Sequence, residues 1–257
     1  MSAGTDVDVE LTTADQKPVG SNCARRVSVA EGYERWAPIY DDIPNPLLAR
    51  EERYLLPLLM DVRKKSVLDL ACGTGRWLER ITEHGCELAL GVDSLEAMLR
   101  VAASKELLRG RLARAACESL PLPEAAFDLG ICSFALGHVW DLKAMVREFA
   151  RVTRVGADMF VSDLHPEASA RGWRVGFRDG SASVEIRTCS RSSEEILGEF
   201  CANGFACVKC ETLWLGEPEA PLFELAGKAG AFAEACRIPA VLVCRFRRVE
   251  TAGGGSA

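Results

Sequence analysis

Two glycines and two acids stand where the chain is best suited to hold a ligand. Gly73 and Gly75 lie in VLDLACGTGRW, where an apolar run ends in a turn. Asp69 lies inside that run, and an unpaired carboxylate in such a strand is costly, so we expect it to orient the turn. Asp93 ends the next apolar run, where a carboxylate can accept two hydrogen bonds from a ribose diol. The pattern predicts a nucleoside-containing cofactor at the ends of two neighbouring strands.

The same turn also matches part of the dinucleotide-binding fingerprint. That fingerprint requires a third glycine, which lets the helix pack closely on the strand. This chain has Leu78 in its place. A nicotinamide-dependent reductase therefore stays open as an alternative on the fold alone, because a fold does not fix a function.

The surrounding elements predict the scaffold that positions these residues. From Ser66 to Leu164, short apolar runs alternate with longer helical stretches, and this order predicts a parallel sheet with helices on both faces. The later runs FACVKCETLWLG and AVLVCRFRR are joined by a long excursion, which is typical of an antiparallel edge. Ser94 is expected to cap the helix that follows it. The sequence predicts an α/β fold, doubly wound around a mostly parallel sheet.

Several segments resemble one known family. VLDLACGTG, GVD, ESLPLPEAAFDLGICSFALGHV and LKAMVREFARVTRVGADMFVSDLHP are similar to successive motifs of the class I S-adenosylmethionine-dependent methyltransferases, especially the group with quinone-ring and malonyl-carrier-protein methyltransferases. The resemblance implies a Rossmann-like sheet of seven strands, the last antiparallel. It also implies S-adenosyl-L-methionine as the methyl donor.

The resemblance further implies which residues contact the cofactor. The backbone from Ala71 to Gly75 would approach its methionine part, Asp93 its ribose, and Ser94 or Leu95 its adenine. The family often has an adenine-binding acid where this chain has Ala116. The implied cofactor residues are Asp69, Ala71, Cys72, Gly73, Thr74, Gly75, Asp93, Ser94, Leu95, Cys117, Glu118 and Ser133.

Methyl transfer from a sulfonium depends on alignment and on exclusion of water. A base is needed only if the acceptor must lose a proton, and His138, His165 and Tyr40 are the candidates for a direct role. Each also has a structural interpretation: His138 can cap or pack, His165 can bond its own loop, and Tyr40 can be a core aromatic. YERWAPIYDD is predicted to be a mobile lid, because Pro38, Pro44 and Pro46 prevent one continuous helix in and after it.

The composition of the chain narrows the classes of molecule that we expect it to bind. A formal charge of −6 gives no reason to expect binding to nucleic acid or to a membrane, and the acidic N-terminus lacks a signal-peptide pattern. A cytoplasmic location is expected, with a small molecule or a carrier-bound acyl group as acceptor. The eleven cysteines are scattered and odd in number. No metal site is expected, since Cys207 and Cys210 lie three apart in a strand and should face opposite sides.

The chain divides into one predicted domain with two tails. Residues 1–28 are expected to be a disordered tail and 249–257 a flexible one. The domain, 29–248, comprises a helical lid (29–62), a cofactor-binding core (63–165), a substrate-side insertion (166–192) and the second half of the sheet (193–248). In the insertion, Arg178-Asp179-Gly180 predicts a hairpin, and Trp173, Arg174, Phe177 and Arg178 are expected near the acceptor. A non-catalytic binding or partner-regulating domain remains an alternative function.

Overall fold

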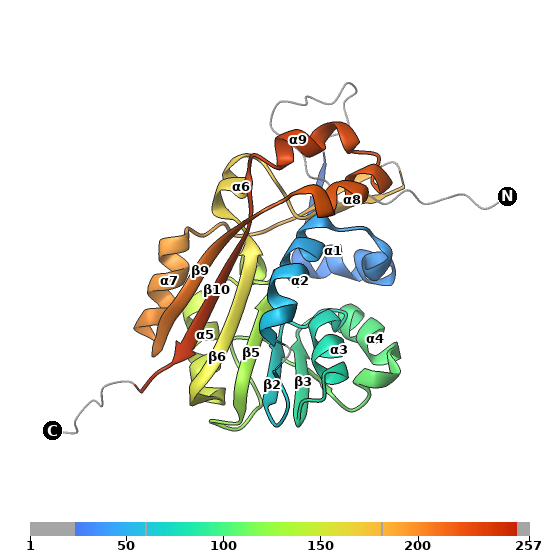
Figure 1. Ribbon diagram of the computed structural model, residues 1–257. Helices are drawn as coiled ribbons and strands as arrows, with labels where there is room; N and C mark the ends of the chain where they lie inside the picture. The colour runs from blue at the N-terminus through green and yellow to red at the C-terminus, as the bar shows by residue number, and fades with distance from the viewer. Residues whose placement is uncertain (1–23, 60, 181, 251–257) are drawn as a thin grey trace.

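The computed structural model describes residues 24–59, 61–180 and 182–250. A seven-stranded sheet forms its centre, in the order β4-β3-β2-β5-β6-β10-β9 (Figure 1). Strands β2 to β6 are mutually parallel, whereas β10 is antiparallel to both β6 and β9. The strands are β2 (Ser66–Leu70), β3 (Leu88–Asp93), β4 (Leu112–Arg114), β5 (Phe127–Ser133), β6 (Thr153–Leu164), β9 (Phe205–Trp214) and β10 (Pro239–Arg248). The predicted α/β fold is confirmed.

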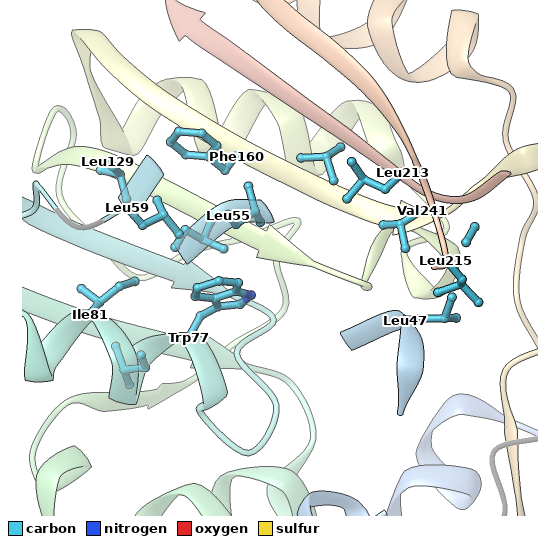
Figure 2. Packing of buried hydrophobic residues seen from close by; sticks show 14 of the residues in the cluster. Leu47, Leu55, Leu59, Trp77, Ile81, Leu129, Phe160, Leu213, Leu215 and Val241 are labelled. Atoms are coloured by element: carbon cyan, nitrogen blue, oxygen red, sulfur yellow. The ribbon is translucent and has the colours of Figure 1, made fainter. Parts of the chain in front are cut away.

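Helices cover both faces of this sheet. On one face, α2 (Pro46–Leu59) and α3 (Arg76–Glu83) pack Leu55, Leu59 and Ile81 against the strands (Figure 2). On the other, α5 (Leu142–Val152) and α7 (Ser193–Ala202) form a second apolar cluster with the sheet. Buried residues of β10 alternate between the two clusters, as the two-residue period of a strand requires.

The other helices lie at the edges and ends of the sheet. Figure 1 shows α1 beside the carboxyl ends of β2 and β3. None of the helices in the described part of the chain combines the length and apolar character that a membrane span needs. The helices at the edges and ends of the sheet are α1 (Val29–Trp36), η1 (Ala37–Asp42), α4 (Glu96–Ser104), η2 (Glu106–Leu108), η3 (Leu136–His138), α6 (Pro166–Ala170), η4 (Glu217–Glu219), α8 (Ala220–Leu225), η5 (Ala229–Ala231) and α9 (Phe232–Ala235).

A small second sheet joins the N-terminal segment to the insertion. β7 (Gly176–Asp179) and β8 (Ala182–Ile186) form the predicted hairpin, and β1 (Arg25–Val27) pairs with β8 in parallel. The predicted tail boundary at residue 28 is therefore wrong. Val27 is buried in an apolar cluster, and Ser28 caps α1 by accepting the Glu31 N–H at 3.2 Å. Residues 1–23 and 251–257 of the predicted tails lie outside the described residues.

The sequence interpretation of the cysteines was wrong at β9. The ladder between β9 and β10 shifts register beside Val208, so Cys207 opposes Phe246 and Cys210 opposes Cys244. Phe246 and Cys244 are two apart on β10 and share a face. The bulge thus brings Cys207 and Cys210 to one side of the sheet, and Cys210 is paired with Cys244 as a disulfide.

Candidate active site

A cavity opens where the carboxyl ends of β2, β3 and β5 meet. The strand order reverses between β2 and β5, and ligands of open α/β sheets bind at such a switch point. The space measures about 950 Å³, including the part open to solvent. Of the residues predicted to contact a cofactor, those that line it are Asp69, Ala71, Cys72, Gly73, Thr74, Asp93, Ser94, Leu95, Cys117, Glu118 and Ser133.

The two glycines of the turn have different roles. Gly73 has φ of +56°, and its N–H donates to Asp93 Oδ2 at 2.8 Å on the cavity wall. Gly75, at φ of +82°, precedes α3 and does not line the cavity. A Cβ added there would lie 2.4 Å from Cδ1 of Leu108. This glycine lets the loop pack against Leu108, and its contact with the cofactor stays a prediction.

Asp93 ties the ends of β2 and β3 together. Its Oδ1 accepts the Leu95 N–H at 2.8 Å, while Oδ2 accepts that of Gly73. Burial raises the pKa of this carboxyl. Each oxygen keeps a second lone pair for a hydroxyl donor in the cavity. Ser94 does not cap the next helix, because α4 begins at Glu96 after Leu95 and has no side-chain cap.

Asp69 orients the first turn of α3, as predicted. It is 2% exposed in β2, and its Oδ2 accepts the Leu78 N–H at 3.0 Å. Burial raises the pKa of this carboxyl to about 7.

Two non-glycine residues of the cavity wall have left-handed backbone conformations. Ala71 has φ of 56° and Phe134 has φ of 50°, and both line the cavity. Such conformations cost free energy and are concentrated at functional sites. No residue type in the sequence marks Phe134 for this role, so sequence reasoning missed it.

A buried ionic network beneath the cavity was also missed. Glu51 of α2 is fully buried and pairs with Arg76 of α3, which lines the cavity. Its Oε1 accepts the Ser133 hydroxyl at 2.7 Å and also that of Ser162, while Oε2 accepts the indole N–H of Trp77 at 3.3 Å. Glu51 occupies the apolar face of α2, spaced by four from Leu47 and Leu55. That spacing is the sequence signal that points to it.

Of the three candidate catalytic residues, two line the first cavity and one does not. His138 lines the cavity, and its Nε2 lies 2.9 Å from the Tyr33 hydroxyl. Burial lowers the pKa of His138 to about 4 and raises that of Tyr40, which also lines the cavity, to about 12. His165 lines neither the first cavity nor the three other cavities compared with it in the described part of the chain. Its Nδ1 accepts the Glu167 N–H at 3.2 Å, which caps α6, so the structure gives it the structural role, and its catalytic role stays a prediction.

The insertion contributes to a neighbouring cavity rather than to the first one. Arg174 lines this second space, of about 520 Å³ including the part open to solvent. Trp173 and Phe177 are about 1% exposed and belong to the packed core, so they can support an acceptor pocket from behind; their place near the acceptor stays a prediction. Arg178 does not line it.

Comparisons with known proteins agree with this geometry. A family model described as a methyltransferase domain matches residues 67–156. The ubiquinone biosynthesis O-methyltransferase of Idiomarina loihiensis is 34% identical over 116 residues, which cover 44% of this chain and 46% of that protein. The demethylmenaquinone methyltransferase of Listeria monocytogenes is 26% identical over 235 residues, which cover 88% and 91%.

A solved structure shares the fold. The S-adenosylmethionine-dependent methyltransferase from Mesorhizobium loti matches with a TM-score of 0.60 and 24% identity, over 77% of this chain and 97% of that one. The chain spans about half the length of the curated relatives that it matches at 31–34% identity. Residues 67–156 thus belong to the methyltransferase-domain family, and the fold, with its antiparallel β10, is that of the S-adenosylmethionine-dependent methyltransferases.

Proposed function

We propose that this protein transfers a methyl group from S-adenosyl-L-methionine to a small molecule or a carrier-bound acyl group. The observation that carries the proposal is the cradle at the ends of β2 and β3, where Gly73 donates to Asp93 on the wall of a ligand-sized cavity. Relatives named for ubiquinone biosynthesis, demethylmenaquinone and malonyl-[acyl-carrier protein] support an acceptor of one of these two kinds.

The residues around the first cavity fit a cationic nucleoside. Asp69, Asp93 and Glu118 line it, and carboxylates favour a nearby sulfonium. Tyr33 and Tyr40 add aromatic faces, which also attract a cation. Glu118 is our candidate for the acid that meets the adenine, because it lines the cavity and Ala116 does not.

When bound, the cofactor supplies an electrophilic methyl group that is displaced in line from its sulfur. The chain must then align the reactants and exclude water. Residues of the N-terminal segment, among them Tyr33, Tyr40 and Leu48, line the first cavity together with the strand-end loops. This supports the assignment of residues 29–62 as a helical lid.

His138 is our candidate to receive the acceptor's proton. Its pKa of about 4 keeps the imidazole neutral near pH 7, so it adds no positive charge beside a sulfonium. An acceptor hydroxyl can pass its proton to the Tyr33 oxygen while the Tyr33 proton moves to Nε2, across the 2.9 Å contact. The hydroxyl becomes strongly acidic as its oxygen gives an electron pair to the methyl carbon, so a weak base suffices.

The test is a pair of measurements on the full chain. Calorimetric titration should show binding of S-adenosylmethionine and no comparable binding of NADH. A panel of acceptors should then release S-adenosylhomocysteine. Binding without turnover of any acceptor would favour the non-catalytic alternative, and preference for NADH would favour the reductase.

A further inference from the structure

The second cavity adjoins the first one. It is formed between the N-terminal segment, the loop after β5, the end of β6 and the start of β7. The residues that line both cavities are Tyr33, Tyr40, Leu48, Phe134 and His138. A molecule in the second cavity would therefore meet one in the first across a shared wall, as a methyl acceptor must meet its donor.

Aromatic and aliphatic side chains form most of this second cavity. Trp36 lies between two parallel rings, with centroid distances of 5.6 Å to Tyr33 and 5.2 Å to Phe177. The aliphatic side chains in its wall are Leu47, Leu48, Leu164 and Val175. Such a lining favours a flat, apolar ligand.

Two buried polar atoms in this lining are unsatisfied. Nε1 of Trp36 and Nδ1 of His138 have no hydrogen-bond partner among the described residues. Buried polar groups are nearly always paired, so an unpaired donor next to a cavity calls for a partner from a ligand or a water. The indole N–H can donate only, and therefore requires an oxygen or another acceptor atom.

The charged groups of the second cavity are already engaged. Arg174, the cation among its described lining residues, donates to the carbonyl oxygens of Ser169 at 2.7 Å and Trp173 at 2.8 Å. Its Nε also lies 3.8 Å from Glu185. Asp163 accepts two backbone N–H groups and adds negative charge to the wall. An anionic ligand would meet this carboxylate and would have to compete with Glu185 and two carbonyl oxygens for Arg174.

Resting on the proposed function, we propose that the second cavity is the acceptor site and selects a neutral, ring-containing molecule with an oxygen that accepts from Trp36. A malonyl group, which carries a carboxylate, does not suit this lining. Of the two acceptor classes left open above, the cavity thus selects the uncharged small molecule.

The experiment compares probes of matched shape and different charge. The full chain is saturated with S-adenosylhomocysteine to fill the first cavity, and is then titrated calorimetrically with 2-naphthol, 2-naphthoate or a malonyl thioester of N-acetylcysteamine. We expect 2-naphthol to bind roughly tenfold more tightly than either anion, because a buried charge needs a partner. Equal or tighter binding of an anion would overturn the proposal.

Three variants locate the binding. Trp36→Phe keeps a ring but loses the N–H, and should weaken naphthol binding about fivefold. Trp140→Phe is the matched control, because Trp140 is 71% exposed and lines none of the described cavities. Val175→Phe fills the second cavity, whose wall includes Val175, but not the first. It should abolish naphthol binding and leave the affinity for S-adenosylhomocysteine unchanged.

The outcomes separate the two proposals. If S-adenosylhomocysteine does not bind the wild type, the proposed function fails, and the titrations without it still report on the second cavity. If S-adenosylhomocysteine binds but Trp36→Phe and Val175→Phe both bind naphthol like the wild type, the acceptor assignment is wrong. A melting curve for each variant shows whether the fold is retained.

Discussion

The two cavities are assembled from very different spans of the chain. Around the first cavity, the contacts of Asp69 and Asp93 join residues no more than 20 apart in sequence. In the wall that the second cavity shares with the first, Tyr33 meets His138 from 105 residues away, and Trp36 of the second cavity stacks on Phe177 of the insertion. Under the proposed function, the first cavity is a cofactor half encoded in local motifs, and the second is an acceptor half built by tertiary packing. Acceptor specificity could then change while the cofactor cradle stays the same.

Glu51 holds α2 against the strand ends of the cofactor half, and its loss should have the largest effect. Glu51→Ala removes the partner of Arg76 from a fully buried position. Breaking one partner of such a pair costs about 3 kcal/mol or more, measurable as the free energy of unfolding in urea. Glu52→Ala is the control, since Glu52 contacts Arg76 and Arg80 in a partly exposed pair and should cost about 1 kcal/mol or less. Equal losses would mean that burial adds nothing to the pair between Glu51 and Arg76.

Two glycine variants test the packing role assigned to Gly75. Gly75→Ala places Cβ against Leu108 at positive φ and should destabilise the fold by about 2–4 kcal/mol. Gly85→Ala is matched in φ, at +76°, but meets nothing within 4 Å, so it should cost only about 1 kcal/mol. In a Leu108→Ala background, Gly75→Ala should cost less than it does in the wild type, whereas the cost of Gly85→Ala should not change. Thermal unfolding of the three single and two double variants measures this.

Asp93→Ala tests the cofactor half directly. The change removes the carboxylate that we propose accepts from the ribose, and it frees the amides of Gly73 and Leu95. We expect a loss of roughly 2–4 kcal/mol in S-adenosylmethionine binding, measured by calorimetry. Asp61→Ala, at an exposed position, should bind like the wild type. Unchanged affinity in Asp93→Ala would remove this carboxylate from the site.

Truncation tests the acceptor half. A chain that begins at Val29 lacks β1 and therefore loses the packing of Val27 against Ile186 and its neighbours. The lost burial should cost about 2 kcal/mol, seen as a lower melting temperature. A chain that begins at Ala24 keeps the strand and is the control. Equal melting temperatures would show that β1 contributes nothing.

Hydrogen exchange tests the lid, where the effect is smallest. The segment from 30 to 45 contacts both cavities, so a ligand should favour its closed state. S-adenosylmethionine should slow exchange there and leave α7, which packs on the sheet away from the cavity, unchanged. Equal, strong protection with and without the ligand would show a rigid element.

Much of the fold and of the cofactor half could be predicted because it depends on local pattern. Alternating apolar runs and helices require a parallel sheet with covered faces, and parallel strands bring their carboxyl ends to one edge. The turn at Gly73 and the acid at Asp93 therefore met as expected. Asp69 also bonded the turn that follows it.

The tertiary structure decided the rest, because these features depend on residues far apart in the chain. Arg76 is paired by Glu51 of another helix, and no spacing within either segment encodes that contact. His138 and His165 both follow strands, yet packing places His138 in the wall that the two cavities share, whereas His165 caps α6. One bulge at Val208 reversed the expected sides of Cys207 and Cys210. Residue types and periods set the sheet and its glycine turn, whereas the packing of distant segments decided which side chains line the two cavities.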